Sequence, residues 1–223
     1  SGDHAARLWD TKTGTPTGKV MRHDDRVRAA AFSPDGKVLI TGSSDRTARL
    51  WDARTGEPVG KVMRHDQEVG VVVFAPDGKA VLTGSGAGPY DSGAARLWNV
   101  RTGEPVGMPM QHKEAVLAAA FSPDGRTVIT GSFDTTARLW DAGTGTPIGR
   151  VMPHDDRVTV VAFSPDGRTA LTGGYDFKAR LWDARTGEPV GEPMLHGLQV
   201  EAGAFSPDGR TVITASGDSI ARL

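Results

Sequence analysis

The chain has 223 residues, a formal net charge of −1 and no cysteine. The missing cysteine excludes disulfides, thiolate metal sites and a cysteine nucleophile, and the balanced charge argues against a dedicated binder of nucleic acid or anionic membranes. No apolar run reaches the roughly 18 residues that a membrane-spanning helix needs, and the first residues are unlike a signal peptide. We therefore expect a turn-rich globular chain that is large enough to bury its own core.

Signals for four short strands follow one another in the first complete sequence unit. An apolar run at 27–32 ends in a Ser-Pro-Asp-Gly turn at 33–36, where proline and glycine favour the dihedral angles of a turn. Further strands are expected at 38–42, 47–52 and 58–63, the last beginning with a proline, which is tolerated at the start of a strand. Four strands in so short a unit leave no room for a helix.

The same unit recurs along the whole chain. Tryptophans, histidines and Pro-Asp-Gly turns all recur with spacings of 42, 47, 42 and 42 residues, and the five extra residues lie within 86–92. Antiparallel four-stranded units repeated about five times are typical of β-propeller blades. A linear β-solenoid is the alternative, but its repeats are usually shorter and do not need one tryptophan each. The tryptophans are Trp9, Trp51, Trp98, Trp140 and Trp182.

The repeated motifs resemble those of the WD40-repeat family over essentially the whole chain. They are Phe-Ser-Pro-Asp-Gly at 32–36, Thr-Gly-Ser at 41–43 and Ala-Arg-Leu-Trp-Asp at 48–52; the last pair becomes Trp-Asn at 98–99. Their near-identity is similar to that of bacterial multi-repeat arrays. The resemblance implies an all-β, WD40-type β-propeller in a single domain, 1–223. The expected repeat cores are 23–63, 65–110, 112–152, 154–194, and 196–223 completed by 1–22.

The resemblance also implies a buried hydrogen-bonded set of His, Ser/Thr, Asp and Trp in each blade, with a structural rather than a catalytic role. In the repeat with the insertion, Asp91 lies one residue too far from Trp98, so we expect this set to lack its carboxylate and the blade to be the least firmly held. The matching residues are His23, Thr41, Asp45 and Trp51; His65, Thr83 and Trp98; His112, Thr130, Asp134 and Trp140; His154, Thr172, Asp176 and Trp182; and His196 and Thr214 with Asp3 and Trp9.

The two ends of the chain carry nearly the same strand, because residues 1–8 almost duplicate residues 216–223. We interpret the chain as a piece of a longer repeat array or as an engineered propeller. The N-terminal copy, which carries Trp9, is expected to complete the last blade and to displace 216–223. In the alternative, each open end completes a blade of a neighbouring copy, so that the chain self-associates.

Positions that differ between repeats indicate where a specific surface would lie. The loop before each first strand and the turn between the second and third strands are expected on one face of a propeller. Four aromatic residues are expected to be exposed on this face, and with their charged neighbours they match the composition of protein-interface hot spots. The candidate interaction face comprises Arg28, Glu68, Tyr90, Lys113, Leu117, Phe133, Tyr175, Phe177, Leu198 and Glu201.

The family resemblance implies a non-catalytic scaffold that binds a protein or peptide. The sequence has no Gly-x-Ser-x-Gly, His-Glu-x-x-His or metal-spaced histidine motif, so we expect no catalytic residue, cofactor or metal, and neither nucleic acid nor membrane as a partner. One alternative is a repeat piece or engineered propeller with no selected partner, whose behaviour is self-assembly. Another is an enzyme or small-ligand propeller that uses a central funnel near Arg28 and Glu201. A cytoplasmic location is expected, with which the absence of cysteine agrees.

Overall fold

The computed structural model describes residues 2–86, 88 and 90–222, and the described residues form strands and connecting turns. Four sheets each contain four consecutive antiparallel strands, and we number these blades 1 to 4. Blade 1 is β3 (Val27–Phe32), β4 (Val38–Ser43), β5 (Thr47–Asp52) and β6 (Pro58–Arg64); blade 2 is β7 (Val69–Phe74), β8 (Ala80–Ser85), β9 (Gly93–Asn99) and β10 (Pro105–His112). Blade 3 is β11 (Val116–Phe121), β12 (Thr127–Ser132), β13 (Thr136–Asp141) and β14 (Pro147–Pro153); blade 4 is β15 (Val158–Phe163), β16 (Thr169–Gly174), β17 (Lys178–Asp183) and β18 (Pro189–Leu195).

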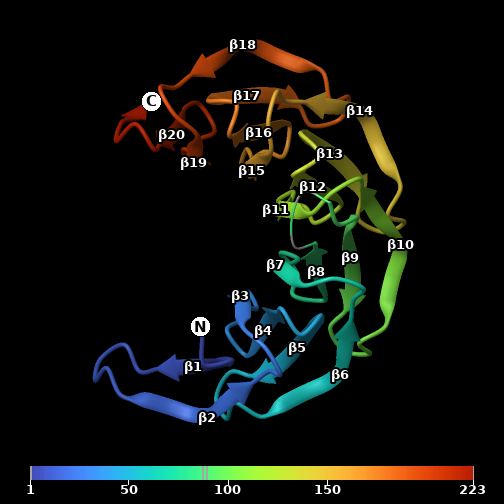
Figure 1. Cartoon of the computed structure of the whole chain (residues 1–223), viewed down its shortest axis with the longest axis vertical. Helices are drawn as coiled ribbons and strands as arrows, with labels where there is room; N and C mark the ends of the chain where they lie inside the picture. Colours follow the sequence, from blue (N-terminus) through green and yellow to red (C-terminus); the bar gives the residue numbers. More distant parts are fainter. Residues whose placement is uncertain (1, 87, 89, 223) are drawn as a thin grey trace.

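Two smaller sheets flank the four blades. The N-terminal sheet pairs β1 (Ala5–Trp9) with β2 (Pro16–Arg22), and the C-terminal sheet contains β19 (Val200–Phe205), β20 (Val212–Ser216) and β21 (Ala221–Arg222). The expected all-β, propeller-type arrangement of four-stranded repeats is confirmed. Figure 1 shows the blades arranged around a centre, with the first strand of each blade innermost and the fourth outermost.

The hairpin turns follow directly from the Ser-Pro-Asp-Gly sequence. In blade 1, the Ser33 hydroxyl donates to Asp35 at 2.7 Å and accepts the Val38 amide at 2.9 Å, while Gly36 takes a φ of 69°. Glycine adopts this left-handed conformation without a steric penalty. The turn therefore fixes the register of β3 against β4.

Successive blades pack closely because a glycine in the second strand leaves room for the next blade. A Cβ atom on Gly42 would lie 2.8 Å from a Val69 methyl group, and one on Gly131 would lie 2.8 Å from a Val158 methyl group. The core is consequently continuous between blades: Ile40 and Met63 of blade 1 belong to one buried cluster with Trp98 of blade 2. Each interface between blades is a layer of hydrophobic core.

The ring of blades is open within one chain. Figure 1 shows the N-terminal and C-terminal sheets on the two sides of the opening, and they do not pair. The prediction that residues 1–22 complete the last blade is therefore wrong for the single chain. Instead, β21 takes the third-strand position, with Thr214 opposite Arg222 and Ala215 opposite Ala221. A strand that follows β20 directly closes only a short loop, whereas the N-terminal copy would have to cross the opening.

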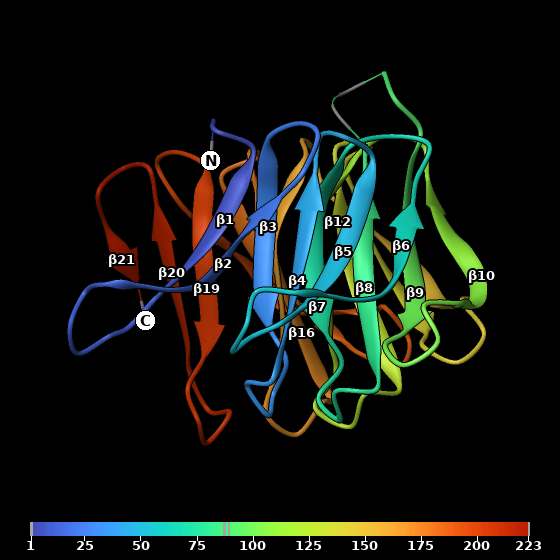
Figure 2. The ribbon, with the colours of Figure 1, turned by 90° about the horizontal axis from the view of Figure 1, so that it is seen from below.

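The two rims of the arc carry different connections. Figure 2 shows β4 and β8 running toward one rim, and the hairpins that join the first and second strands lie at the other rim. The insertion expected at 86–92 thus belongs to the rim formed by the turns between second and third strands. Residues 87 and 89 of this insertion lie outside the described residues.

Candidate interaction face

A hydrogen-bonded chain joins the histidine that precedes the first strand of each complete blade to the second and third strands of that blade. In blade 1, Trp51 donates its indole N–H to Thr41 Oγ1 at 2.8 Å, and Thr41 Oγ1 lies 2.7 Å from His23 Nε2. His23 Nδ1 in turn lies 2.9 Å from the Asp45 carboxylate. A neutral histidine that carries its proton on Nδ1 satisfies all these groups, with Thr41 donating to Nε2.

The surroundings hold this histidine neutral and the aspartate ionised. Burial lowers the pKa of His23 below its ordinary value, against the opposing effect of Asp45. Burial alone would raise the pKa of Asp45, but hydrogen bonds from Thr47, from the Asp24 amide and from His23 outweigh it and lower the pKa to about 2. A buried, fully satisfied network of this kind holds strands together and offers no free group for chemistry.

Blades 3 and 4 repeat this geometry. The imidazole–carboxylate distance is 3.0 Å in both, the imidazole–threonine distance is 2.7 Å in both, and the indole–threonine distances are 2.8 and 2.7 Å. The structure thus brings together the residues that the family resemblance grouped: His112, Thr130, Asp134 and Trp140 in blade 3, and His154, Thr172, Asp176 and Trp182 in blade 4.

Blade 2 differs, as its displaced Asp91 indicated. Trp98 donates to Thr83 Oγ1 at 2.8 Å, and Thr83 lies 3.1 Å from His65 Nε2. His65 Nδ1 and Arg96 Nε are both buried and have no hydrogen-bond partner among the described residues. Burial, together with the nearby Arg96 charge, lowers the pKa of His65 to about 4.

The C-terminal sheet does not contain the set expected from the sequence. His196 lies 3.0 Å from Thr214, but its Nδ1 contacts Arg222 at 2.8 Å, and Asp218 bonds to the Gly197 amide and to Arg222. Trp9 is 58% exposed in the N-terminal sheet, and Asp3 pairs with Arg7. The expected grouping of Asp3 and Trp9 with His196 is therefore wrong for the single chain, for the same reason that the ring stays open.

The loop before the first strand of each blade bonds to the turn between the second and third strands of the same blade. These two sets of connections therefore lie at one rim. The Ser44 amide donates to the Arg26 carbonyl at 2.9 Å, the Phe133 amide to Ala115 at 2.9 Å and the Tyr175 amide to Arg157 at 3.0 Å. Side chains that vary between repeats are therefore displayed together. We call this rim, with the neighbouring ends of the innermost strands, the loop face.

On the loop face of blades 1 and 2, three side chains form a bridge. Arg28 donates to Ser44 Oγ at 2.8 Å and to Glu68 at 2.7 Å, and Ser44 also donates to Glu68 at 2.9 Å. Arg28 and Glu68 were expected on this face; Ser44 completes their contact. The bridge orders a charged patch across the seam between the two blades.

Blades 3 and 4 are bridged by a cation–π stack. The Arg157 guanidinium lies 3.5 Å from the centre of the Tyr175 ring and 4.8 Å from the centre of the Phe133 ring. Phe133 and Tyr175 are consequently half-buried rather than exposed, which corrects the expectation from sequence. Arg157 was not among the predicted residues; an aromatic residue in each of two successive turns is the signal that could have drawn attention to it.

The other predicted residues of this face divide into exposed side chains and a central group. Tyr90 is 96% exposed, and Phe177 and Leu198 are each 42% exposed. Lys113 is exposed and donates its amide to Asp134. Leu117 and Glu201 line a shallow central hollow together with Gly70 and Thr159, while Arg28 is held by Ser44 and Glu68 instead. Arg28 is thus not among the residues that line the hollow with Glu201.

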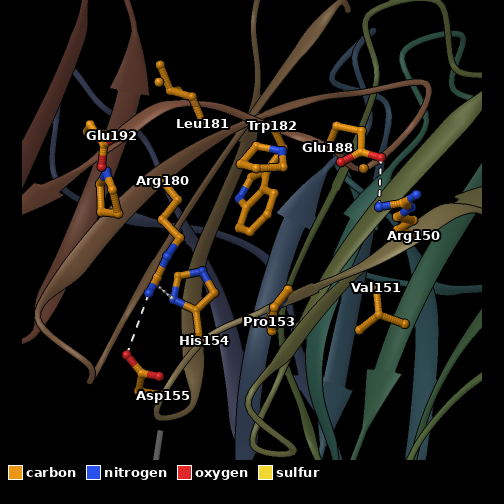
Figure 3. A pocket seen from close by; sticks show the side chains of 14 residues that line it. Arg150, Val151, Pro153, His154, Asp155, Arg180, Leu181, Trp182, Glu188 and Glu192 are labelled. Atoms are coloured by element: carbon orange, nitrogen blue, oxygen red, sulfur yellow. Dashed lines mark hydrogen bonds and ion pairs between the residues drawn. The ribbon is translucent and has the colours of Figure 1, made fainter.

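Grooves on the outer circumference were not predicted. Figure 3 shows one of about 420 Å³ between β14 and the following β17–β18 pair, where Arg150 faces Glu188 and Arg180 contacts His154 and Asp155. A groove of about 440 Å³ at the equivalent position follows β2 and is lined by Lys19, Trp51 and Glu57. Because equivalent positions of the repeats form both grooves, the grooves are seams between blades rather than one specific pocket.

Among the described residues, no group of three or more His, Cys, Asp or Glu side chains could hold a metal ion. Across the same part of the chain, the structure contains no helix long and apolar enough to cross a membrane.

The blades, their buried networks and the open arc together define a β-propeller repeat protein. The family model described as "WD domain, G-beta repeat" matches residues 14–52, 103–141, 145–183 and 188–223, which is more than half of the chain. The chain therefore belongs to the WD40-repeat family. The insertion at 86–92 lies within the unmatched segment 53–102.

Two known proteins are similar to this chain over different shares of its length. Ribosome assembly protein 4 of Chaetomium thermophilum is 49% identical over 39 residues, which are 18% of this chain and 8% of that protein. The crystal structure of the computationally designed Ika8 protein superimposes with a TM-score of 0.85 at 23% identity, over 99% of this chain and 65% of the designed chain. This chain thus spans a small part of the first protein and about two thirds of the second. The likeness to the designed protein supports the fold.

Proposed function

We propose that this protein is a non-catalytic interaction scaffold whose loop face binds a protein or peptide. Membership of the WD40 family supports the general role, since a propeller in this family is generally a scaffold. The arrangement of residues supports the choice of face, because the repeat-identical polar groups are buried in structural networks and the variable side chains gather at one rim.

The observation that carries the proposal is the stack of Phe133, Arg157 and Tyr175. A guanidinium held over aromatic rings keeps N–H donors at its edge, so it can donate hydrogen bonds to a carboxylate or carbonyl of a partner while the rings supply apolar contact. Aromatic and arginine side chains are enriched among residues that dominate binding energy at protein interfaces. Their prior ordering reduces the entropy lost on binding.

The test is selection of peptides from a displayed library on the intact chain, followed by affinity measurements with variants. We expect Arg157→Ala and Tyr175→Ala each to weaken the selected peptides at least about tenfold, in keeping with interface hot spots. Phe32→Ala is the matched control, because Phe32 is an exposed aromatic (57%) at the opposite rim. Peptides that bind equally well to the wild type and to both loop-face variants would contradict the proposal.

A further inference from the structure

A recurring corner joins the outer strand of each blade to the turn before the outer strand of the next. Lys19 pairs with Glu57, Lys61 with Glu104 and Arg150 with Glu188, the last at 3.0 Å (Figure 3). The glycine before each glutamate packs against the preceding strand: a Cβ on Gly187 would lie 2.4 Å from the Arg150 carbonyl oxygen. We call this contact the seam corner.

One seam corner inside the chain has a different pair of residues. Met108 occupies the position of the lysine or arginine, and Thr146 occupies that of the glutamate. The backbone contact is kept, since the Met108 amide donates to the Thr144 carbonyl at 2.8 Å and a Cβ on Gly145 would lie 2.0 Å from the Met108 carbonyl oxygen. Within the chain, glutamate therefore faces a cation and threonine faces a side chain without positive charge.

Two halves of a seam corner lie at the open ends of the arc. On β18, Glu192 stands where the other outer strands have Lys, Met or Arg, and at the N-terminal sheet Thr15 stands where three repeats have Glu. Among the described residues other than its chain neighbours, none has an atom within 4 Å of a Cβ position on Gly14, unlike its equivalents Gly56, Gly145 and Gly187. The Glu192 carboxylate would repel a glutamate at the other side of a seam corner but can lie beside a threonine. Glu192 and Thr15 could therefore form a seam corner with each other.

The adjoining strands expose groups that the blades bury. Trp9 is 58% exposed, whereas Trp51, Trp98, Trp140 and Trp182 are between 4% and 7% exposed. Ile213 on β20 is 44% exposed, whereas its equivalents Ile40 and Ile129 are fully buried. The exposed tryptophan lies at one end of the arc and the exposed isoleucine at the other.

The register of β21 shows how β1 would fit. Ala221 and Arg222 lie opposite Ala215 and Thr214, and residues 1–8 repeat the sequence around them, so Ala6 and Arg7 would take the same places. Trp9 would then lie opposite Val212, as Trp51 lies opposite Leu39, and Leu8 would cover Ile213, as Leu50 covers Ile40. The pair β1–β2 is already assembled, with Ala6 and Leu8 packed on a buried cluster that includes Trp51.

We propose that the C-terminal sheet binds the N-terminal sheet of a second copy of this chain. Strand β1 of the incoming copy replaces the two-residue β21 and β2 becomes the outer strand, which gives a four-stranded blade shared by two chains. Trp9 of the incoming copy donates its indole N–H to Thr214 of the receiving chain, and Thr15 of the incoming copy lies beside Glu192 of the receiving chain. This association follows from the open edges of the two end sheets and does not depend on whether the loop face binds a partner.

The first test is the mass of the 223-residue chain in solution over a wide range of concentration, with Trp9→Ala as the variant. The wild type is expected to associate, and Trp9→Ala to weaken association at least about a hundredfold, because it removes a tryptophan that the shared blade would bury. Folding of the four blades is not at risk, since Trp9 is exposed in the single chain. A wild type that stays monomeric at millimolar concentration, or association that Trp9→Ala leaves intact, would overturn the proposal.

The second test addresses the register through the seam corner. Thr15→Glu places a carboxylate beside Glu192 of the other copy and is expected to weaken association about two- to fivefold at low salt. Adding Glu192→Lys to Thr15→Glu should restore it, because the pair then matches Lys19 and Glu57. Thr146→Glu is the matched control inside the chain and should leave association unchanged. Equal affinities for the Thr15→Glu single variant and the double variant would overturn the proposed register.

Discussion

One threonine hydroxyl connects the histidine and the tryptophan of each complete blade. Thr130→Val leaves the Trp140 N–H and the His112 imidazole without their partner in blade 3, at nearly constant side-chain volume. Two buried polar groups left unsatisfied should lower the free energy of unfolding by about 2–4 kcal/mol. The measurement is the urea unfolding midpoint compared with Thr211→Val, an exposed control that should change little. Equal midpoints for the two variants would show that the hydroxyl has no such role.

His65 makes stability depend on pH. Its pKa of about 4 lies below the value of about 6.5 in an unfolded chain, so the unfolded state takes up the proton first as the pH falls. The contribution is present above about pH 6.5 and is lost as the pH falls toward 4. It amounts to about 2 kcal/mol between pH 7 and pH 5.

NMR titration of the imidazole signals measures the pKa of His65 directly. His65→Gln should reduce the change in unfolding free energy between pH 7 and pH 5, even though it also removes the contact with Thr83. His112 serves as an internal comparison, since its pKa is lowered by burial but Asp134 opposes the shift. A His65 pKa above that of His112 would contradict the assignment.

At the scale of elements, the strands followed from the sequence because each has its own local signals. Proline and glycine mark the turn at 33–36, and the run at 27–32 alternates between partly buried and exposed positions. The missing carboxylate of blade 2 was visible as a one-residue change in spacing. The stack on Arg157 could not be predicted from the sequence, because it joins side chains of two different blades. Phe133 and Arg157 lie 24 residues apart in the sequence.

The hairpin β8–β9 should be the least protected second hairpin of the four blades. His65, which bonds to Thr83 of this hairpin, lacks a partner for Nδ1 among the described residues. The equivalent histidines of the networks in blades 1, 3 and 4 bond to an aspartate. Fewer tertiary bonds lower the free energy of local opening. Hydrogen exchange should therefore be faster for the amides of β9 than for those of β5 and β13. Slower exchange in β9 would contradict this expectation.

Replacing the insertion tests the cause of that difference. Substituting 86–93 by Ser-Asp-Arg and Ala94 by Thr reproduces the connection of blade 1 at 44–47. The new aspartate should bond to His65 as Asp45 bonds to His23, which raises the His65 pKa and slows exchange in β9. If exchange in β9 stays fast after the His65 pKa has risen, the missing carboxylate does not control the opening of this hairpin.

At the scale of the whole molecule, the closure of the ring did not follow from the repeats. Contacts that recur between repeats, such as those of Gly42 with Val69 and Gly131 with Val158, make successive blades stack. Small differences in the angle between neighbouring blades nevertheless add up around the ring. The sequence period counts blades without giving that angle. For this reason the duplicated ends predicted a closed last blade, while the single chain places Trp9 and Thr214 in separate sheets.

An open arc of blades should unfold from its ends. Each blade contacts only its neighbours, so stability is the sum of the blades and the interfaces between them. The N-terminal and C-terminal sheets each have one neighbouring blade and fewer strands, whereas β8 and β12 lie in blades packed on both sides. At concentrations where the chain is monomeric, amides of β20 should therefore exchange earlier in urea than those of β12, and Thr214→Val should cost less stability than Thr130→Val. A single cooperative loss of protection in β12 and β20 at one urea concentration would show instead that the interfaces couple the whole arc into one unit.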